Sequence, residues 1–241
     1  MRRRYFCGAL VGVLVIAAAL SAAAGGATPS RWHGPMHKLT NSTSTNWSGY
    51  AVTGGRYTRV SAAWTEPKAT CSGTAYSSFW VGLDGDTSNT VEQTGIDADC
   101  SGSTPQYYAW YEMYPKFPVN LGGKVAPGDK LSASVTTNGS GSFTLTITDS
   151  TQGWTNTKTA RLKSAKLASA EVIAEAPSSS GGVLPLANFG TVSFTGATVN
   201  GNVLTSGTSG LDAITMQSGS TVKAQPGTIS NGSFSVTWKH S

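Results

Sequence analysis

Carboxyl and amide side chains carry the candidate chemistry of this sequence, because its three histidines are poorly placed. His33 and His37 lie near the N-terminus, and His240 is the next-to-last residue. A Ser-His-Asp or Cys-His mechanism needs an imidazole within hydrogen-bond reach of its nucleophile. Zinc chemistry also lacks ligands with suitable spacing. An enzyme with this sequence is therefore expected to use carboxylates, amides or hydroxyls, with no metal and no cofactor.

Two pairs of polar side chains in the first half of the chain are candidate site residues. Asp84 and Asp86 flank Gly85 directly after an apolar run, so they serve either in turn formation or in a site. The ligand spacing of a calcium loop does not follow them. Glu92 and Gln93 are adjacent, and neighbours on a strand face opposite ways, so only one of them can point into a site.

Glu112 lies within an aromatic run over residues 108–115 that includes Trp110. The run either lines a cleft or forms a core strand with one exposed glutamate. Farther along, Glu171 and Glu175 are four residues apart, which on a strand places them on one face with backbones about 13 Å apart. A solvated pair on an outer sheet face is the alternative to a catalytic role.

The elements that must position these residues are strands. The 29 glycines, 7 Trp, 8 Tyr and 7 Phe among 241 residues, with only 12% charged residues, favour short strands joined by turns over a helical bundle. Strands are expected over 47–52, 60–64, 78–83, 107–114, 131–135, 142–148, 170–176, 191–194 and 233–238. Only residues 157–170 are compatible with a short helix. The predicted fold class is all-β, an antiparallel β-sandwich of two packed sheets resembling concanavalin or a jelly roll.

The N-terminus has the three regions of a secretory signal peptide. Arg2, Arg3 and Arg4 precede an apolar run, and a small-residue stretch ends at Ala27. We expect residues 1–27 to be a signal peptide, 28–45 a polar arm or short propeptide, and 46–241 the β-sandwich domain. Without the three arginines, the sequence has 14 basic and 12 acidic residues. No basic patch indicates nucleic-acid binding. The expected product is secreted, monomeric and free of the membrane after signal cleavage.

Two cysteines follow the signal segment. In an exported protein Cys71 and Cys100 are expected to form one disulfide, with a metal-binding or free pair as the alternative.

Six segments in order resemble the glutamic peptidases, or eqolisins. They are Asn46-Trp47-Ser48-Gly49-Tyr50, residues 79–86, Gln93-Thr94-Gly95, residues 108–115, residues 170–175 and residues 186–194. The resemblance covers nearly the whole chain after the signal segment. It implies two packed antiparallel sheets and secreted, acid-active endopeptidase activity.

The resemblance also implies the site residues. Gln93 and Glu175 correspond to the catalytic Gln–Glu dyad, and Trp80 and Asp84 to positions that line the site, with Trp110 and Glu112 as further substrate-binding candidates. The sequence departs from the family at Val172, where Trp is common, and at Ala176, where Asp is common. These departures affect the shape of the subsites.

In this interpretation, Glu175 takes a proton from the attacking water and Gln93 stabilises the oxyanion. A base near its ordinary pKa of about 4 favours activity in acid. Protein or peptide substrates are the expected partners. Two other functions stay open from the residues alone: a jelly-roll glycoside hydrolase using Glu171 and Glu175, and a non-catalytic carbohydrate-binding module that stacks sugars on aromatic rings.

Overall fold

The computed structural model describes residues 31–36, 38–40 and 42–241. The predicted signal peptide and residues 28–30 lie outside this part of the chain. Within it, no helix is long and apolar enough to cross a membrane.

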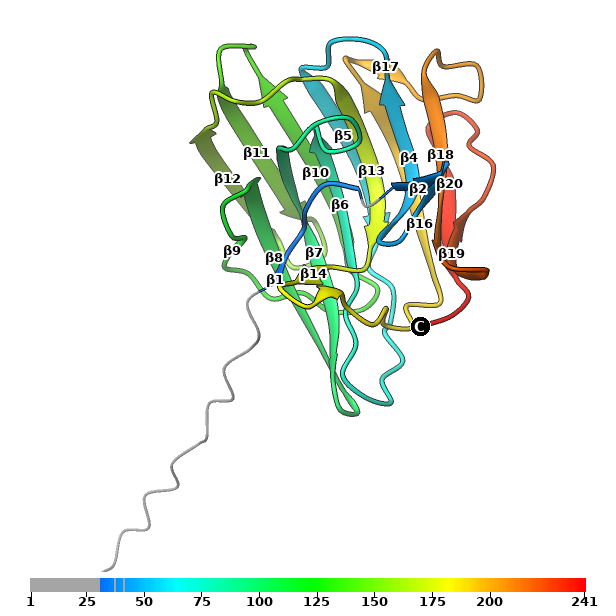
Figure 1. Cartoon of the computed structure of the whole chain (residues 1–241). Coiled ribbons are helices and arrows are strands. Elements are labelled where there is room, and N and C mark those ends of the chain that lie inside the picture. Colours follow the sequence, from blue (N-terminus) through cyan, green and yellow to red (C-terminus); the bar gives the residue numbers. More distant parts are fainter. Residues whose placement is uncertain (1–30, 37, 41) are drawn as a thin grey trace, which may run out of the picture.

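Two antiparallel layers form the molecule (Figure 1). The first layer has the strand order β18, β4, β13, β6, β7, β8, β9. These strands span Leu211–Ser218, Trp47–Thr53, Ser169–Glu175, Ser78–Leu83, Val91–Ser101, Thr104–Tyr114 and Val119–Asn120. The layer contains every strand that carries a predicted site residue.

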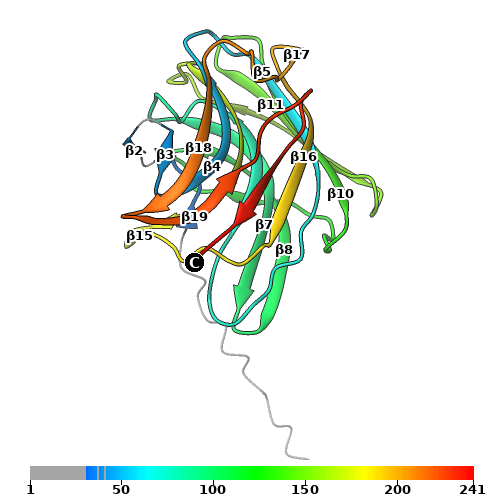
Figure 2. The same ribbon diagram turned by 90° about the vertical axis from the view of Figure 1, so that its right-hand side faces the viewer.

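The second layer has the order β12, β11, β10, β5, β16, β20, β19. Its strands span Trp154–Arg161, Ser142–Asp149, Lys130–Thr137, Arg59–Thr65, Thr191–Val199, Phe234–Trp238 and Thr221–Pro226. β18 pairs with β4 through Leu211–Ile214 and with β19 through Met216–Ser218, so it connects the layers along one edge (Figure 2). The predicted β-sandwich is confirmed.

Short strands complete the fold. β17 (Asn202–Val203) forms a hairpin with β16, and β2 (Lys38–Thr40) pairs with β3 (Thr43–Ser44), which lies beside β18. β1 (Arg31–Trp32), β14 (Ser178–Ser179) and β15 (Gly182–Val183) make a separate three-stranded sheet. The ordered strands therefore begin before the expected domain boundary at residue 46.

Side-chain alternation and residue type explain which strands were predictable. β11 alternates buried and half-buried residues along its length, as its sequence indicated. β7 was not predicted as a strand, because Gly95, Asp97 and Asp99 are residue types that strands rarely contain. The short helix considered for residues 157–170 is wrong, because β12 extends to Arg161 and β13 starts at Ser169.

The main hydrophobic core lies between the layers. Phe79, Val81 and Leu83 of β6 pack in one apolar cluster with Trp64 and Phe194 of the second layer. The intervening residue Trp80 belongs to a separate apolar cluster with Trp47, Trp110 and Ile173. Because successive side chains on a strand point to opposite faces, this second cluster lies on the outer face of the first layer.

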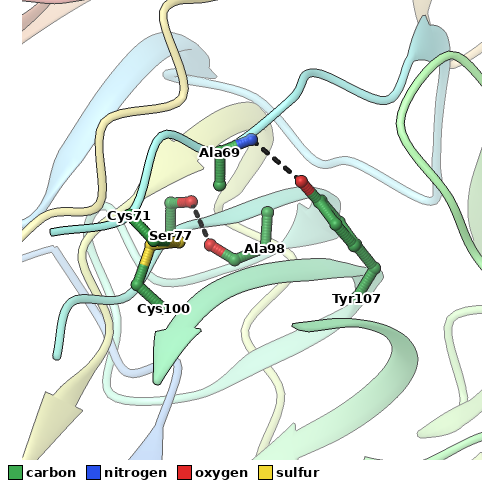
Figure 3. Close-up of a disulfide and its surroundings, with 6 residues drawn as sticks. All are labelled: Ala69, Cys71, Ser77, Ala98, Cys100 and Tyr107. Atoms are coloured by element: carbon green, nitrogen blue, oxygen red, sulfur yellow. Dashed lines mark hydrogen bonds between the residues drawn. A yellow bond between two sulfur atoms is a disulfide. The ribbon is translucent and has the colours of Figure 1, made fainter. Parts of the chain in front are cut away.

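A disulfide joins Cys71 to Cys100, 29 residues apart, as predicted (Figure 3). It ties the loop before β6 to the end of β7. Beside it, the Ala69 N–H donates to the Tyr107 hydroxyl at 2.9 Å, and Ser77 Oγ donates to the Ala98 carbonyl at 2.7 Å. These contacts hold the far end of β7 against β6 and β8.

Replacement of both Cys71 and Cys100 by Ser is expected to lower the free energy of unfolding by about 3–4 kcal/mol, because the unfolded chain regains the entropy of an open loop of this length. Urea denaturation at neutral pH, with and without the disulfide, measures the difference. A difference below about 1 kcal/mol would contradict this account.

Candidate active site

Polar side chains that lie between Gln93 and Glu175 in the sequence come together on the outer face of the first layer. Four adjacent strands, β13, β6, β7 and β8, supply them. In one row of the sheet Gln93 pairs with Gly82 on one side and Glu112 on the other. In another row Glu175 and Asp97 both pair with Ser78. The residue Trp80 and its partners Ile173 and Gly95 lie between these rows.

The indole of Trp80 separates the two rows, and two glycines make room for it. A Cβ on Gly95 would lie 2.5 Å from Trp80 Cβ, and one on Gly82 would lie 2.9 Å from the ring atom Cζ3. Neither position accepts a side chain without movement of the indole. The two glycines therefore allow Trp80 to stay fully buried on the sheet surface.

Glu175 is fully buried and receives hydrogen bonds from two side chains. Trp80 Nε1 donates to its Oε2 at 2.8 Å, and Asn46 Nδ2 donates to its Oε1 at 3.4 Å. Burial raises the pKa of Glu175 well above 4.5, the Glu112 charge raises it further, and the Trp80 hydrogen bond opposes both effects. The covered site therefore favours the neutral form of this carboxyl group.

Glu112 orients the amide of Gln93. Gln93 Nε2 donates to Glu112 Oε2 at 2.9 Å, so the nitrogen end of the amide points toward Glu112. Both residues are fully buried. Burial raises the pKa of Glu112 well above 4.5, while the hydrogen bonds from the His33 backbone and from Gln93 lower it. Glu112 Oε2 can accept this hydrogen bond whether the carboxyl group is ionised or protonated.

Residues 31–36 lie across this face, where Figure 1 shows the blue N-terminal segment passing in front of the sheet. Arg31 and Trp32 pair antiparallel with Ser179 and Ser178. The His33 N–H donates to Glu112 Oε2 at 3.0 Å, and Gln93 Nε2 donates to the His33 carbonyl. These contacts hold the segment over the site.

The ring of His33 fills the space between Glu175 and Asp97. It stacks on Trp110 with centroids 3.9 Å apart and an angle of 11° between the planes. Its Nδ1 lies 3.6 Å from Glu175 Oε2, and its Nε2 lies 3.5 Å from Asp97 Oδ1. Burial, followed by the Arg31 charge, lowers the pKa of His33 well below 6.5. The imidazole is therefore neutral here and does not offset the carboxylates.

Arg31 lies in an acidic clasp formed by Asp97 and Asp99 of β7. Its Nη2 is 3.2 Å from Asp97 Oδ2 and is also paired with Asp99 Oδ2. The guanidinium carbon lies 4.9 Å from the Tyr76 ring centroid and 5.3 Å from that of Tyr108. Arginine is suited to such sites because it combines a delocalised charge with a planar stacking surface.

Burial controls the ionisation of the acidic clasp. It raises the pKa of Asp97 to about 6, against the lowering effect of Arg31. It raises the pKa of Asp99 to about 8, with a further contribution from the Asp97 charge. As the pH falls through these values, the carboxylates that hold Arg31 become neutral.

The structure brings together Gln93, Glu175, Trp80, Trp110 and Glu112, five of the six predicted catalytic and substrate-binding residues. Asp84 differs. Its carboxylate accepts backbone hydrogen bonds from Lys166, Leu167 and Ala168 at 2.7–2.8 Å, and it is fully buried. These contacts give Asp84 a structural role in holding the loop before β13, and its place in the substrate site stays a prediction.

Glu171 and Glu92 are also buried, but beside other acids. Burial raises the pKa of Glu171 well above 4.5, and the charges of Asp84, Asp86 and Glu92 raise it further. Burial also raises the pKa of Glu92 to about 9. Burial thus favours the neutral form of both carboxyl groups. The idea of a solvated Glu171–Glu175 pair is wrong, because neither side chain is exposed.

Sequence reasoning missed Asp97, Asp99 and His33. The two aspartates lie in a segment that was not predicted as a strand, and His33 was excluded because it lies near the N-terminus. Strand alternation starting from Gln93 places Asp97 and Asp99 on the same face, so recognition of β7 would have found them. No local signal placed His33. Among the described residues, no group of three His, Cys, Asp or Glu side chains could hold a metal ion.

Buried carboxyls and one amide on a sheet face, with an extended peptide lying over them, define a site suited to peptide hydrolysis. Residues 45–238 match the Peptidase A4 family, and the chain belongs to that family of peptide hydrolases. The resemblance to glutamic peptidases is thereby confirmed, and the glycoside hydrolase and lectin alternatives fall away.

Two curated relatives are similar to the chain. It is 28% identical to Aspergillopepsin-2 of Aspergillus niger over 220 residues, covering 81% of this chain and 78% of that protein. It is 36% identical to Scytalidopepsin B of Scytalidium lignicola over 110 residues, covering 45% of this chain and 41% of that protein.

Solved structures of the same class share the fold. Scytalido-glutamic peptidase with a transition state analog inhibitor superposes with a TM-score of 0.71 at 27% identity, covering 81% of this chain and 98% of that one. Aspergilloglutamic peptidase from Aspergillus niger gives 0.62 at 28% identity, covering 68% and 99%.

Trp80→Phe tests the role of the indole N–H. Loss of a hydrogen bond to an ionised carboxylate, about 1.5–3 kcal/mol, should raise the pKa of Glu175 by about one to two units. The acid limb of the profile of kcat/KM against pH is expected to follow the ionisation of Glu175. It should therefore move to higher pH by the same amount. Profiles of kcat/KM against pH measure this shift.

Trp64→Phe is the matched control, because Trp64 is equally buried and donates to another carboxylate, Glu66 Oε2, at 3.1 Å. The acid limb of kcat/KM for Trp64→Phe should stay at the wild-type pH even if the stability of this variant falls. Equal shifts in both variants would contradict the assignment to Trp80.

Asp84→Asn tests the structural role of Asp84. The amide has only one acceptor atom for three backbone N–H groups, so the free energy of unfolding should fall by about 2–4 kcal/mol. The KM for a peptide substrate, measured well below the unfolding temperature, should change less than about twofold if the side chain does not touch substrate. A large rise in KM with unchanged stability would instead assign Asp84 to the substrate site.

Proposed function

We propose that this chain is an acid-active endopeptidase in which Glu175 is the general base and Gln93 the oxyanion donor. One observation carries the proposal: a peptide segment lies extended over the sheet with a single carbonyl hydrogen-bonded to Gln93, and the same residue lies beside Glu175. A protein substrate crossing the face in this way would present its scissile carbonyl to both groups.

The reaction follows from the two side chains. Ionised Glu175 removes a proton from water as the water oxygen attacks the carbonyl carbon, and later delivers a proton to the departing amine. Gln93 Nε2 donates to the developing oxyanion, a contribution worth roughly 3–4 kcal/mol where one such donor has been removed. Gln93 Oε1 receives no hydrogen bond from the described residues and can orient the attacking water.

Glu112 supports this chemistry as a substrate-binding and positioning residue. Its acceptance of a hydrogen bond from Gln93 Nε2 keeps the oxygen end of the amide away from the scissile carbonyl. The same oxygen accepts the backbone N–H of the residue that presents the carbonyl. Trp110 provides a flat surface for the side chain of that residue.

Acid activity is consistent with the density of carboxyl groups under the substrate. Glu175, Glu112, Asp97 and Asp99 all have raised pKa values because of burial. Closely spaced buried carboxylates cannot all ionise, so covering them with a neutral peptide is easiest in acid. Residues 31–36 contribute to this burial, and a site without them has a Glu175 pKa closer to the ordinary value.

The relatives support the substrate class. Their names identify them as peptidases, and one solved relative, SCP-B, holds the tripeptide Ala-Ile-His. In this chain the segment Arg31-Trp32-His33 places a histidine beside Glu175. Export belongs to the same proposal, supported by the signal-peptide pattern and by the disulfide.

Glu175→Gln should abolish digestion of an acid-denatured protein at about pH 3, with kcat/KM at least 10²- to 10⁴-fold lower, because the amide keeps the shape but cannot accept the proton. Peptide release measured by mass spectrometry gives the rates.

Glu171→Gln is the matched control, since it changes the other buried glutamate of β13 in the same way. We expect it to retain activity within about threefold of wild type, because the charges that act on its carboxyl group are those of Asp84, Asp86 and Glu92, outside the proposed dyad. If Glu171→Gln were inactive and Glu175→Gln active, the base would be misassigned.

A further inference from the structure

We propose that Asn46 and Ser44 are positioning residues for the base: Ser44 turns the amide of Asn46 so that its nitrogen faces Glu175. The inference rests on the proposed function, because it assigns both residues to the base named there. They act through Glu175 and not on the scissile bond. Ser44 lies before residues 45–238, the part of the chain that matches the family, so its role is a property of this chain's own sequence.

Asn46 holds the end of β13 at two points. Its Nδ2 donates to Glu175 Oε1 at 3.4 Å, and its backbone carbonyl accepts the N–H of Ala176 at 2.8 Å. Asn46 is fully buried and lies directly before β4, whose first residue, Trp47, pairs with Glu175. One residue therefore fixes the backbone that follows Glu175 and also reaches its carboxyl group.

Asn46 and Trp80 each contact one oxygen of the Glu175 carboxyl group. Trp80 Nε1 donates to Oε2 at 2.8 Å, whereas Asn46 donates to Oε1. The Trp47 ring meets the Trp80 ring edge-on, with centroids 4.9 Å apart, and supports the indole. The terminal torsion of a glutamate is otherwise broad. A donor on each oxygen therefore restricts the plane in which the base presents its lone pairs.

The amide of Asn46 can support Glu175 in only one of its two orientations. An asparagine side chain carries an acceptor oxygen at one end and a donor nitrogen at the other. If Oδ1 faced the carboxylate, two sets of lone pairs would meet and no hydrogen bond would form. A buried amide near a carboxylate thus needs a neighbour that selects its orientation.

The hydroxyl of Ser44 makes this selection. The backbone N–H groups of Asn46 and Trp47 donate to Ser44 Oγ at 3.2 and 3.1 Å. A hydroxyl has two acceptor sites and one hydrogen, so these two contacts leave the hydrogen for donation. It is donated to Asn46 Oδ1 at 2.8 Å. An NH2 group in that place could not accept it, so the oxygen end faces Ser44 and the nitrogen end faces Glu175.

Ser44 is itself held by the sheet. It belongs to β3, where it pairs with Met216 of β18 and with Lys38 of β2. Its side chain is fully buried. Serine hydroxyls often accept backbone N–H groups a few residues farther on, an arrangement that serves local structure alone. The contact of Asn46 with a buried carboxyl group extends this arrangement to the base.

The sign of the expected effect follows from the charges around Glu175. Glu112 of β8 and Asp97 of β7 raise its pKa through their charges, and His33 Nδ1 lies 3.6 Å from its Oε2. These groups stay in place when Ser44 or Asn46 is changed. An N–H donor stabilises the ionised carboxylate, so its loss raises the pKa of Glu175 further. The acid limb of kcat/KM then moves to higher pH.

Ser44→Ala and Asn46→Ala, made in the full chain, test the inference. Each should move the acid limb of kcat/KM to higher pH by about 0.5–1 unit, the effect of one hydrogen bond. KM at a pH above the limb should change less than about twofold, because neither side chain is assigned a contact with substrate. Ser44→Thr keeps the hydroxyl and should keep the wild-type limb.

A second measurement reports the same pKa without turnover. The sequence has five glutamates, so carboxyl carbon resonances of isotopically labelled glutamate can be followed by NMR during a pH titration. The resonance of Glu175 is the one absent from Glu175→Gln. Its midpoint should rise in Ser44→Ala and Asn46→Ala by the same amount as the acid limb.

Ser77→Ala is the matched control. Ser77 is also a fully buried serine, and its Oγ donates to the Ala98 carbonyl at 2.7 Å. Its replacement should lower the melting temperature and leave the acid limb and the Glu175 midpoint at their wild-type values.

Three results would overturn the inference. If Glu175→Gln is inactive but Ser44→Ala and Asn46→Ala keep the wild-type limb and midpoint, the positioning role is excluded and the proposed function stands alone. An equal shift in Ser77→Ala would make the shift a general consequence of lost stability. If Glu175→Gln retains wild-type activity, the base lies elsewhere and both proposals fail together.

Discussion

The burial of carboxyl groups on one face of a sheet is the constraint on which this molecule depends. The first layer has the hydrophobic core on its inner face and Glu175, Glu112, Asp97 and Asp99 on its outer face. Because side chains alternate along each strand, core and site are fixed by the same register. A slip of β13 by one residue would place Val172 and Ala174 in the site and glutamates in the core.

Each of these carboxyls needs compensation, and the surroundings supply it unevenly. Glu175 has the indole of Trp80 and the amide of Asn46, and Glu112 has the amide of Gln93. Asp97 and Asp99 depend on Arg31, which lies in the N-terminal segment instead of the sheet. The covering segment therefore stabilises the site electrostatically while it blocks access to it. This coupling makes the ionisation of the site depend on whether the segment is present.

The same arrangement explains how a protein with few charged residues builds a site from them. A water-filled cleft with four ionised carboxylates would bind peptides poorly, since closure would bury several charges at once. Raised pKa values favour the neutral, hydrogen-bonding form of these groups, and the proposed base Glu175 must lose its proton before it can act. The aromatic residues Trp80 and Trp110 add flat, apolar surfaces around them.

The sequence by itself determined the class of fold, the disulfide and the identity of the residues grouped around Gln93 and Glu175. Strand alternation, turn residues and ordered motifs are local properties, so they can be recognised in the sequence without the fold. The strand β7 escaped detection because Gly95, Asp97 and Asp99 are residue types that strands rarely contain, although Gln93 lies on it. The structural role of Asp84 was not predicted, because its partners are backbone amides more than 80 residues away in the chain.

Only the tertiary structure decided what covers the site. Residues 31–36 carry no local signal for docking, because their partners lie on β7, β8, β13 and β14 and come together only when those strands pair. Contacts between such distant parts of the chain depend on the position of the whole sheet, and no spacing in the sequence encodes them. The sequence therefore determined which groups could do chemistry, and the packed sheet determined which peptide lies over them.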